Sequence, residues 1–351
     1  GRTLMKKNHP KFRALSSLIG TTVGAGIFAL PYVFSHLGLF VFSILLFSVS
    51  VVSTFINQTY VKIIETTHGD HQLPGYASIY LGKWGRRVTF LSLALGLYGA
   101  LTAYLVQGGD FVATFFPLVR PWTGIIFWLF FSTIVLLGLA AASWGEAVLS
   151  VGILLLISAL SLYSLSVGEW DIDTFRRFLA PKNLELGKTF SLVSVTLFAF
   201  GGTAAVPEVE EIMRGERGRL SRIVGLSSLL VTGLYLIFSF SVVMISGEAT
   251  SPAALEGLAT FLGGGISLVA PFIGVLALGS SFLLLVYSLR EIFFRDFELP
   301  LVISWFFALF PPLIIYLVSH LDFIAILSLA GSAGIGLSWL LVLLIYFRAR
   351  D

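Results

Sequence analysis

Ten stretches of this chain are long, apolar and free of Asp, Glu, Lys and Arg, and no other feature limits the fold as strongly. They lie within residues 14–35, 37–61, 88–109, 121–145, 147–168, 189–207, 223–247, 257–289, 299–319 and 323–347. Each is close to the 20 or so apolar residues that a spanning helix needs. The bilayer core offers the backbone no water, so each stretch must satisfy its own hydrogen bonds as a helix. The sequence predicts an all-α integral membrane protein with ten transmembrane helices.

Two of these stretches contain residues that interrupt helices. The first reads GTTVGAGIFALP from Gly20 to Pro31, and the sixth reads LFAFGGTAAVPEVEE from Leu197 to Glu211. In both, a glycine stands five residues before the proline, and the two prolines are 176 residues apart, about half the chain. Glycine and proline are also common in ordinary membrane helices, where glycine allows close packing. The matched spacing favours two deliberate breaks, in helices 1 and 6.

The position of the breaks suggests a repeat. Five spans begin with each break, and an odd number of spans makes the second copy enter the membrane from the opposite face. Matched interruptions in two halves of opposite orientation are typical of secondary transporters, whose sites lie at the breaks. We therefore predict a 5+5 inverted repeat, with residues 14–167 as the first repeat, 168–188 as an external linker and 189–347 as the second repeat.

The basic residues predict the orientation, because Lys and Arg concentrate in cytoplasmic loops. With the N-terminus inside and ten spans, only five of the 22 Lys and Arg residues fall outside: Arg120, Arg176, Arg177, Lys182 and Lys188. We expect a multi-pass protein of the cell's inner (plasma) membrane with both termini cytoplasmic and the lipid bilayer around it. The net charge of +3 then reflects topology, and nothing in the sequence indicates a nucleic acid or an obligate protein partner.

An interrupted helix exposes backbone groups that can bind a substrate. Free N–H groups at the start of a half-helix suit a carboxylate, and free carbonyls at the end of one suit an ammonium group or a cation. A zwitterionic amino acid needs both, and the absence of ionisable side chains in the breaks favours a neutral substrate. The candidate residues are Thr22, Val23, Gly24, Ala25, Gly26, Phe200, Gly201, Gly202 and Thr203.

Aromatic residues near the breaks are further candidates. Tyr98 and Tyr104 in the third span could line and gate the site, with Phe198 or Phe200 as an apolar lid. Their alternative role is packing or anchoring at the membrane interface.

Oxygen-bearing residues in the eighth span suggest a coupling ion. Hard cations such as Na⁺ take oxygen ligands. Five oxygens could form such a site, from Gly20, Val23, Ala277, Ser280 and Ser281. Alternatively, the serines bond to neighbouring carbonyls, as membrane serines often do.

Acidic residues follow the second break. Glu208, Glu210 and Glu211 form either a proton relay or an intracellular gate, or a solvated helix end facing Arg214 and Arg217.

Several functions are disfavoured. The chain has no Cys, so thiolate catalysis and Cys-ligated metals are excluded. Its five His lack ligand spacing, and no catalytic set of side chains is apparent. We predict that the protein is not an enzyme and that it needs no cofactor, with Na⁺ as one candidate for the coupling ion.

Four motifs resemble a known family in combination: GTTVGAGIFALPYVF, YGALTAYLVQGGD, FAFGGTAAVPEVEE and FPPLIIYLVSHLDFIAILSLAG. Together they resemble the amino acid/auxin permease and aromatic (hydroxy/aromatic) amino acid permease group of the amino acid-polyamine-organocation superfamily. The resemblance implies a leucine-transporter-type fold, alternating access and cation-driven amino acid uptake. It places the substrate and the ion on the residues named above. Some members of the superfamily carry a lysine in the fifth span in place of sodium, and this chain has none there.

The resulting prediction is a symporter for neutral, including aromatic, amino acids that is coupled to Na⁺ or H⁺. Two alternatives remain open. A passive facilitator or channel could line a pore with the same breaks, and a non-transporting sensor could use the same pocket for signalling.

Overall fold

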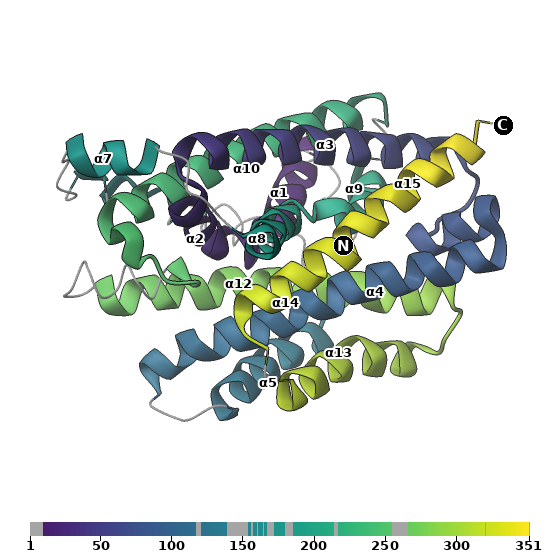
Figure 1. Ribbon diagram of the computed structural model, residues 1–351. Helices are drawn as coiled ribbons and strands as arrows, with labels where there is room; N and C mark the ends of the chain where they lie inside the picture. The colour runs from purple at the N-terminus through teal and green to yellow at the C-terminus, as the bar shows by residue number, and fades with distance from the viewer. Residues whose placement is uncertain are drawn as a thin grey trace.

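The computed structural model describes residues 10–116, 121–138, 154–166 apart from 156, 160 and 164, 172–179, 185–213, 217–254, 266–319 and 321–350. Within them the chain forms helices and no strand (Figure 1). The α-helices are α1 (Pro10–Thr22), α2 (Gly26–Leu37), α3 (Leu39–Thr66), α4 (Leu73–Phe115), α5 (Trp122–Leu136), α7 (Ile172–Leu179), α8 (Leu186–Ala199), α9 (Val206–Met213), α10 (Leu220–Ser246), α12 (Ile266–Glu291), α13 (Leu301–Val318), α14 (Phe323–Leu329) and α15 (Leu337–Arg348). Short 3₁₀ turns are η2 (Gly202–Ala205), η3 (Arg217–Arg219) and η4 (Gly247–Ala249), and π-helical segments are η5 (Ile292–Asp296) and η6 (Ala330–Gly336).

The prediction of an all-helical membrane protein is confirmed for the described residues. Seven of their helical segments are long and apolar enough to cross a membrane, or eight when the bent pair α1 and α2 counts as one span. Helix α5 is apolar but has only 15 residues. The predicted fifth span, 147–168, lies largely outside the described residues, so the count of ten spans and the repeat boundaries stay predictions.

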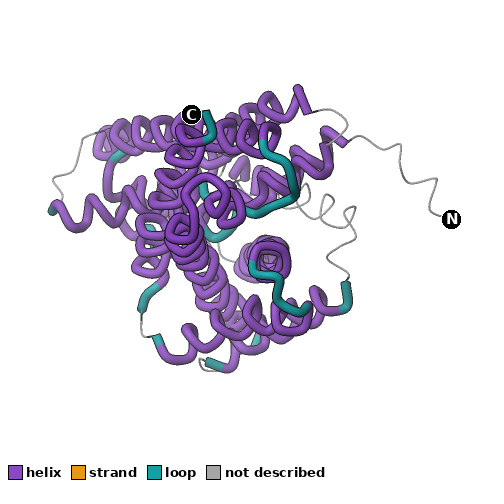
Figure 2. The backbone as a smooth tube through the Cα atoms, turned by 90° about the vertical axis from the view of Figure 1, so that its right-hand side faces the viewer, coloured by secondary structure: helices purple, strands orange, loops and turns teal. Residues whose placement is uncertain are grey.

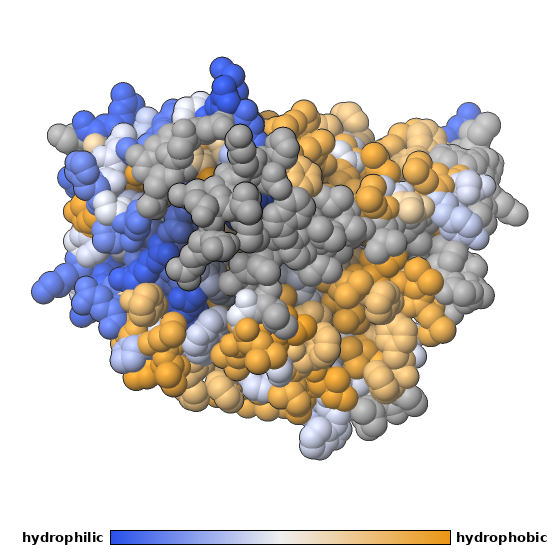
Figure 3. Space-filling model, turned by 180° about the vertical axis from the view of Figure 1, so that it is seen from behind, coloured by the Kyte–Doolittle hydropathy of each residue, from blue (hydrophilic) through white to orange (hydrophobic). Residues whose placement is uncertain are grey.

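The outer surface of the bundle is apolar. Large hydrophobic side chains stand exposed on several helices, among them Val51 of α3, Phe130 of α5, Val302 of α13 and Leu340 of α15. Figure 3 shows such residues spread over one flank, while hydrophilic residues gather towards one end. Lipid tails can cover these side chains at no cost, whereas water could not.

The two interrupted segments lie at the centre of the bundle. Helices α1, α2 and α8 lie between α3 and α10 on one side and α4 and α12 on the other (Figure 1). Helix α2 packs on α8 and α10, and α4 packs on α12, α5 and η6. Figure 2 views the same helices from the end at which the chain terminates. The surrounding helices thus form a frame around the segments that carry the breaks.

Small residues bring the last span close to α4. A Cβ on Gly96 would lie 3.3 Å from the Cα of Gly334, and a Cβ on Gly99 would lie 2.7 Å from the Cβ of Ala330. Ser92 adds a hydrogen bond from its hydroxyl to the Gly334 carbonyl, at 2.8 Å. Close approach through glycine and small residues is the usual way in which helices associate in lipid. This contact places η6 and α15 beside the central cavity.

The first part of α4 turns away from the rest of the helix at Gly82, whose φ of 70° is the left-handed conformation that favours glycine. The N-terminus of this part is fixed by Asp296, whose carboxylate accepts hydrogen bonds from the backbone N–H of Gln72 (3.1 Å) and Gly75 (2.9 Å). A carboxylate at a helix N-terminus satisfies otherwise unpaired donors. Asp296, just beyond the end of α12, therefore holds this segment against the bundle.

Candidate substrate site

The break in the first span is present. Helices α1 and α2 are bent by 55° relative to each other, across residues 23–25. Gly24 N–H bonds back to the Thr22 carbonyl, two residues away, so the α-helical pattern stops there. A Cβ on Gly24 would overlap the hydroxyl of Tyr104, so this side chain lies directly against the break. Tyr104 is buried and hydrogen-bonds to the backbone of Ala25 and to the side chain of Ser281.

The sixth span is also interrupted. Helix α8 ends at Ala199, η2 begins at Gly202, and the Gly202 N–H bonds to the carbonyl of Phe200 at 2.8 Å. A Cβ on Gly202 would overlap the hydroxyl oxygen of Thr22, so the two breaks touch each other. A side chain at this position would have to displace the Thr22 hydroxyl, so glycine permits the close contact of the two breaks.

Hydrogen bonds between buried polar groups link the second break to two other spans. Thr203 donates its hydroxyl hydrogen to Asn57 Oδ1 at 2.8 Å, and Trp339 Nε1 donates to the Thr203 oxygen at 3.1 Å. Ser53 donates to the carbonyl of Phe200 at 3.2 Å. Buried polar groups that are paired in this way specify one arrangement of the backbone. Helices α3 and α15 thus hold the interrupted segment.

The hydroxyl of Tyr235, on α10, lies within hydrogen-bond distance of both breaks. Its side chain is fully buried, and its hydroxyl lies 2.8 Å from the carbonyl oxygen of Thr22 and 2.7 Å from that of Ala199. These are the last residues of α1 and α8. A helix end leaves its final carbonyls without intrahelical partners, and the single hydrogen of this hydroxyl lies within reach of both carbonyls.

We expect Tyr235→Phe to weaken substrate binding about tenfold or more. The variant leaves the buried Ala199 carbonyl without this donor, and an unsatisfied buried polar group costs about 1–3 kcal/mol. The matched control is Tyr98→Phe, because the Tyr98 hydroxyl donates to a carbonyl at the same distance, 2.8 Å, but on α13 (Phe307). Ligand affinity of both variants, measured by equilibrium binding, should fall only for Tyr235. Equal losses would argue against a role for Tyr235 in positioning the breaks.

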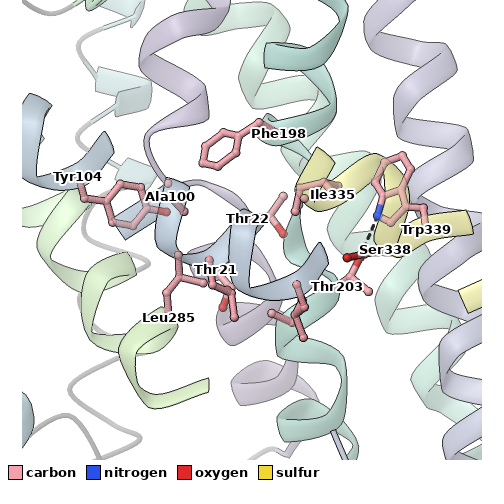
Figure 4. Close-up of a pocket in the computed structure, with 17 residues that line it drawn as sticks. Thr21, Thr22, Ala100, Tyr104, Phe198, Thr203, Leu285, Ile335, Ser338 and Trp339 are labelled. Carbon is pink, nitrogen blue, oxygen red and sulfur yellow. Dashed lines mark hydrogen bonds between the residues drawn. The ribbon is translucent and has the colours of Figure 1, made fainter. Parts of the chain in front are cut away.

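A cavity lies where the breaks meet α4 and the last span (Figure 4). Predicted site residues that line it are Thr22, Gly24, Tyr104, Phe198, Gly201 and Thr203. Lining residues that the sequence did not indicate are Thr21, Leu93, Gly96, Leu97, Ala100, Ala204, Leu285, Gly334, Ile335, Ser338 and Trp339. The cavity has hydroxyl groups on several sides and mostly apolar walls, a lining that is usual for small-molecule sites.

The remaining predicted residues lie behind this lining. Gly26 packs on the backbone of Ala199, and Phe200 is buried with its ring 5.4 Å from that of Tyr235. Val23 and Ala25 are buried within the first break, and Gly202 faces Thr22. Tyr98 is not among the cavity's lining residues, and its hydroxyl is bonded to α13. Of the two tyrosines considered in the third span, Tyr104 is the one that the structure brings to the breaks.

The sequence did not indicate that the tenth predicted span lines the cavity. Gly334, Ile335, Ser338 and Trp339 line the cavity from η6 and α15. Their only sequence signal is the run AGSAGIG, which forms the π-helical segment η6. Such segments often mark functional positions, because they displace the residues that follow.

Three of the five predicted sodium ligands come together. The Ser281 hydroxyl lies 3.2 Å from the Gly20 carbonyl oxygen and 3.5 Å from that of Val23. Ser280 bonds instead to the Ala277 carbonyl of its own helix, at 3.0 Å. The converging groups are neutral oxygens at the open end of α1, a donor set that suits a hard monovalent cation. No group of three or more His, Asp or Glu side chains able to hold a metal occurs in the described part of the chain.

The acidic residues after the second break are bonded to other helices or buried. Glu208 accepts a hydrogen bond from Ser288 at 2.8 Å, and Glu211 pairs with Arg295 at 2.5 Å. Glu210 is only 2% exposed. The interpretation of a solvated helix end is therefore wrong for Glu210, because burial removes it from solvent. Arg214 lies outside the described residues.

Comparisons with known proteins agree with this geometry. The family model described as transmembrane amino acid transporter protein matches residues 10–298. The chain belongs to this transporter family. The match extends from α1 to the end of α12 and includes both breaks, which confirms the sequence-based resemblance to amino acid permeases and the prediction that the protein is not an enzyme. A small-molecule amino acid as substrate and a surrounding membrane follow from membership.

Two curated relatives are bacterial transporters. The Haemophilus influenzae tyrosine-specific transport system 1 is 24% identical over 277 residues, which cover 75% of this chain and 68% of the relative. The glutamine transporter 2 of Aliivibrio fischeri is 23% identical over 242 residues, or 67% of this chain and 61% of the relative.

Solved structures show the same fold at low identity. MhsT in complex with L-phenylalanine has a TM-score of 0.63 at 17% identity, over 94% of this chain and 87% of MhsT. A histidine-to-alanine mutant of the manganese transporter from Eremococcus coleocola has a TM-score of 0.57 at 14% identity, over 96% of this chain and 85% of that transporter. Mhp1, a nucleobase-cation-symport-1 family transporter, has a TM-score of 0.56 at 13% identity, over 92% of this chain and 75% of Mhp1. The fold of this family member is thus one that transporters of different substrates share.

Proposed function

We propose that this family member is a secondary active transporter that moves neutral amino acids, aromatic ones included, by symport with Na⁺ or H⁺. The observation that supports this most strongly is the cavity at which both helix breaks meet. Backbone groups and hydroxyls line it, and its described lining includes no ionisable side chain other than the Tyr104 phenol. Such a lining matches a zwitterion with an uncharged side chain. Accumulation against a gradient requires a coupling ion, and the oxygens around Ser281 supply one candidate site.

The transport cycle would follow from the same arrangement. We expect a 5+5 inverted repeat in which the breaks of helices 1 and 6 belong to a moving bundle, and the surrounding helices belong to the frame. Substrate and ion that bind across this boundary favour closure, because each contacts both parts. The protein would reside in the plasma membrane with cytoplasmic termini.

In this proposal the residues have distinct roles. The Tyr104 hydroxyl and the backbone from Thr22 to Gly26 would bind the α-carboxylate and α-amino groups. Phe198 lies on another side of the cavity and would cover the substrate (Figure 4). Gly20, Val23 and Ser281 would hold Na⁺, with Ala277 and Ser280 turning towards the ion when it binds.

Uptake into proteoliposomes tests the proposal. Purified protein would be reconstituted, and uptake of a mixture of labelled amino acids would be measured under a sodium gradient or, separately, under a pH gradient. An ionophore that collapses the imposed gradient serves as the control. We expect at least about tenfold accumulation of a neutral amino acid under one gradient only. Equilibration without accumulation would indicate a passive facilitator, and binding without flux would indicate a sensor.

A further inference from the structure

Exposed basic residues lie at the end of the bundle where α3 and α15 end and α4 begins (Figure 1). We call five of them the basic flank: Lys62, Lys83, Arg87, Arg348 and Arg350. In the part of the chain that the structure describes, none of the five has a carboxylate within ion-pair distance. Their positive charge is therefore not neutralised by the described protein.

Two aromatic rings lie among these charges. The Nζ of Lys62 is 6.0 Å from the centroid of the Tyr346 ring, and the guanidinium carbon of Arg350 is 5.7 Å from the same centroid. The guanidinium carbon of Arg87 is 5.5 Å from the centroid of the Trp84 ring, which is 74% exposed. A ring orients a cation but carries no net charge. These contacts hold the basic side chains in place and leave their charge to an outside partner.

Arginines of α12 and η5, at the same end of the bundle, are instead paired within the protein. Arg290 pairs with Glu291, and Arg295 pairs with Glu211 at 2.5 Å. Lys and Arg at the ends of spans also set the orientation of a membrane protein. Orientation alone does not explain why the interior arginines have carboxylate partners and the basic flank has none.

The helices that carry most of the basic flank bring no acidic residue near it. The sequence has no Asp or Glu from residue 73 to residue 109 or from residue 323 to residue 350. The hydroxyls of Ser92 and Ser338 are 3.0 Å apart, and Gly96 lies against Gly334, so α4 and α15 run antiparallel. This register brings residues 83–87 of α4 level with the last turns of α15.

Apolar side chains continue from the basic flank into the membrane. Leu91, four residues after Arg87 on α4, is 60% exposed, and Leu344, four residues before Arg348 on α15, is 53% exposed. Residues four apart share one face of a helix. Each helix thus presents positive charge at its end and an exposed apolar face beside it, which matches a molecule with an anionic head and hydrocarbon tails.

We infer that the basic flank binds the headgroup of an anionic phospholipid, whose acyl chains lie along the exposed faces of α4 and α15. Basic clusters at the end of a span attract anionic lipids. The exposed indole of Trp84 lies where the headgroup region meets the hydrocarbon, a depth that suits tryptophan. A soluble anion could contact the same charges but would leave the apolar faces unused. The inference does not depend on which solute is transported.

Retention of lipid by the purified protein tests the inference. The protein in detergent would receive equal amounts of phosphatidylglycerol and phosphatidylcholine with identical acyl chains, and native mass spectrometry would identify the lipids that stay bound. We expect phosphatidylglycerol to be retained at least about fivefold more than phosphatidylcholine. Glycerol 3-phosphate should not displace it, because this soluble headgroup has no acyl chains. Equal retention of the two lipids, or displacement by glycerol 3-phosphate, would overturn the inference.

A matched pair of variants locates the lipid. Lys83→Gln combined with Arg87→Gln should weaken phosphatidylglycerol binding about 25-fold, because each basic residue near an anionic headgroup contributes about fivefold. The control is Lys188→Gln combined with Arg222→Gln, which removes two exposed charges from α8 and α10 and should leave binding unchanged. All four side chains are exposed, so size-exclusion profiles should match that of the unmodified protein. Unchanged binding in the first variant, or an equal loss in both, would refute the placement of the lipid.

Discussion

Gly26→Leu should abolish substrate uptake, with activity reduced about a hundredfold or more. A Cβ at this position would lie 2.5 Å from Ala199 Cα and 2.8 Å from Ala199 Cβ, so the new side chain collides with backbone that cannot move aside. The collision separates α2 from α8 at the level of the two breaks. Inserting atoms into a packed core typically costs about 1–3 kcal/mol, and here the cost falls on the geometry of the site itself.

The same result is expected for Gly202→Leu, whose side chain would displace the Thr22 hydroxyl that lies against it. The matched control is Gly233→Leu in the middle of α10, where an added Cβ meets no atom within 4 Å. Uptake would be measured in proteoliposomes after size-exclusion chromatography has confirmed a monodisperse sample of each variant. Unimpaired uptake by both Gly26→Leu and Gly202→Leu would refute the placement of the substrate at the breaks.

Ser280→Ala combined with Ser281→Ala should remove the dependence of uptake on sodium, lowering sodium-driven accumulation by about tenfold or more. The Ser281 hydroxyl lies within hydrogen-bond reach of both the Gly20 and the Val23 carbonyls, so its loss removes the side-chain oxygen at the centre of the proposed ion site. A carrier driven by protons should instead remain largely active, because no titratable group is changed.

Ser241→Ala provides the control for this variant. Its hydroxyl is buried and bonds to the Phe238 carbonyl of its own helix, away from the proposed ion site. Initial rates would be recorded over a series of sodium concentrations at constant ionic strength. A sodium dependence that is unchanged in the double variant would mean that the ion binds elsewhere.

The breaks themselves were predictable because their cause is local. Glycine and proline are unfavourable within a helix, and the matched spacing of glycines to Pro31 and Pro207 identified both interruptions, although Pro31 itself lies inside α2. The structure bends the first span by 55° and replaces the α-helix by a 3₁₀ turn in the sixth. Ser281 converges on the Gly20 and Val23 carbonyls, whereas Ser280 bonds to the Ala277 carbonyl of its own helix, so the ion site stays a prediction.

The choice among candidate side chains was less predictable. Tyr98 and Tyr104 are six residues apart on one helix, and only contacts with other helices show that Tyr98 faces α13 while Tyr104 faces the first break. Tyr235 carries no motif at all, since its importance lies in two carbonyls supplied by segments more than 30 residues away in sequence. The sequence left open whether Glu210 belongs to a solvated helix end, and the packing around α9 buries it.

The sequence by itself determined that this chain is a helical membrane protein of an amino acid transporter family with interruptions in two spans. Those properties depend on the length of the apolar stretches, on the positions of glycine and proline, and on motifs that are contiguous in the chain. Only the tertiary structure decided that α15 and η6 complete the cavity, and that Asn57 and Trp339 bond to Thr203 at the second break. The physical reason is that these contacts join residues far apart in the chain, and no local pattern encodes which helices meet.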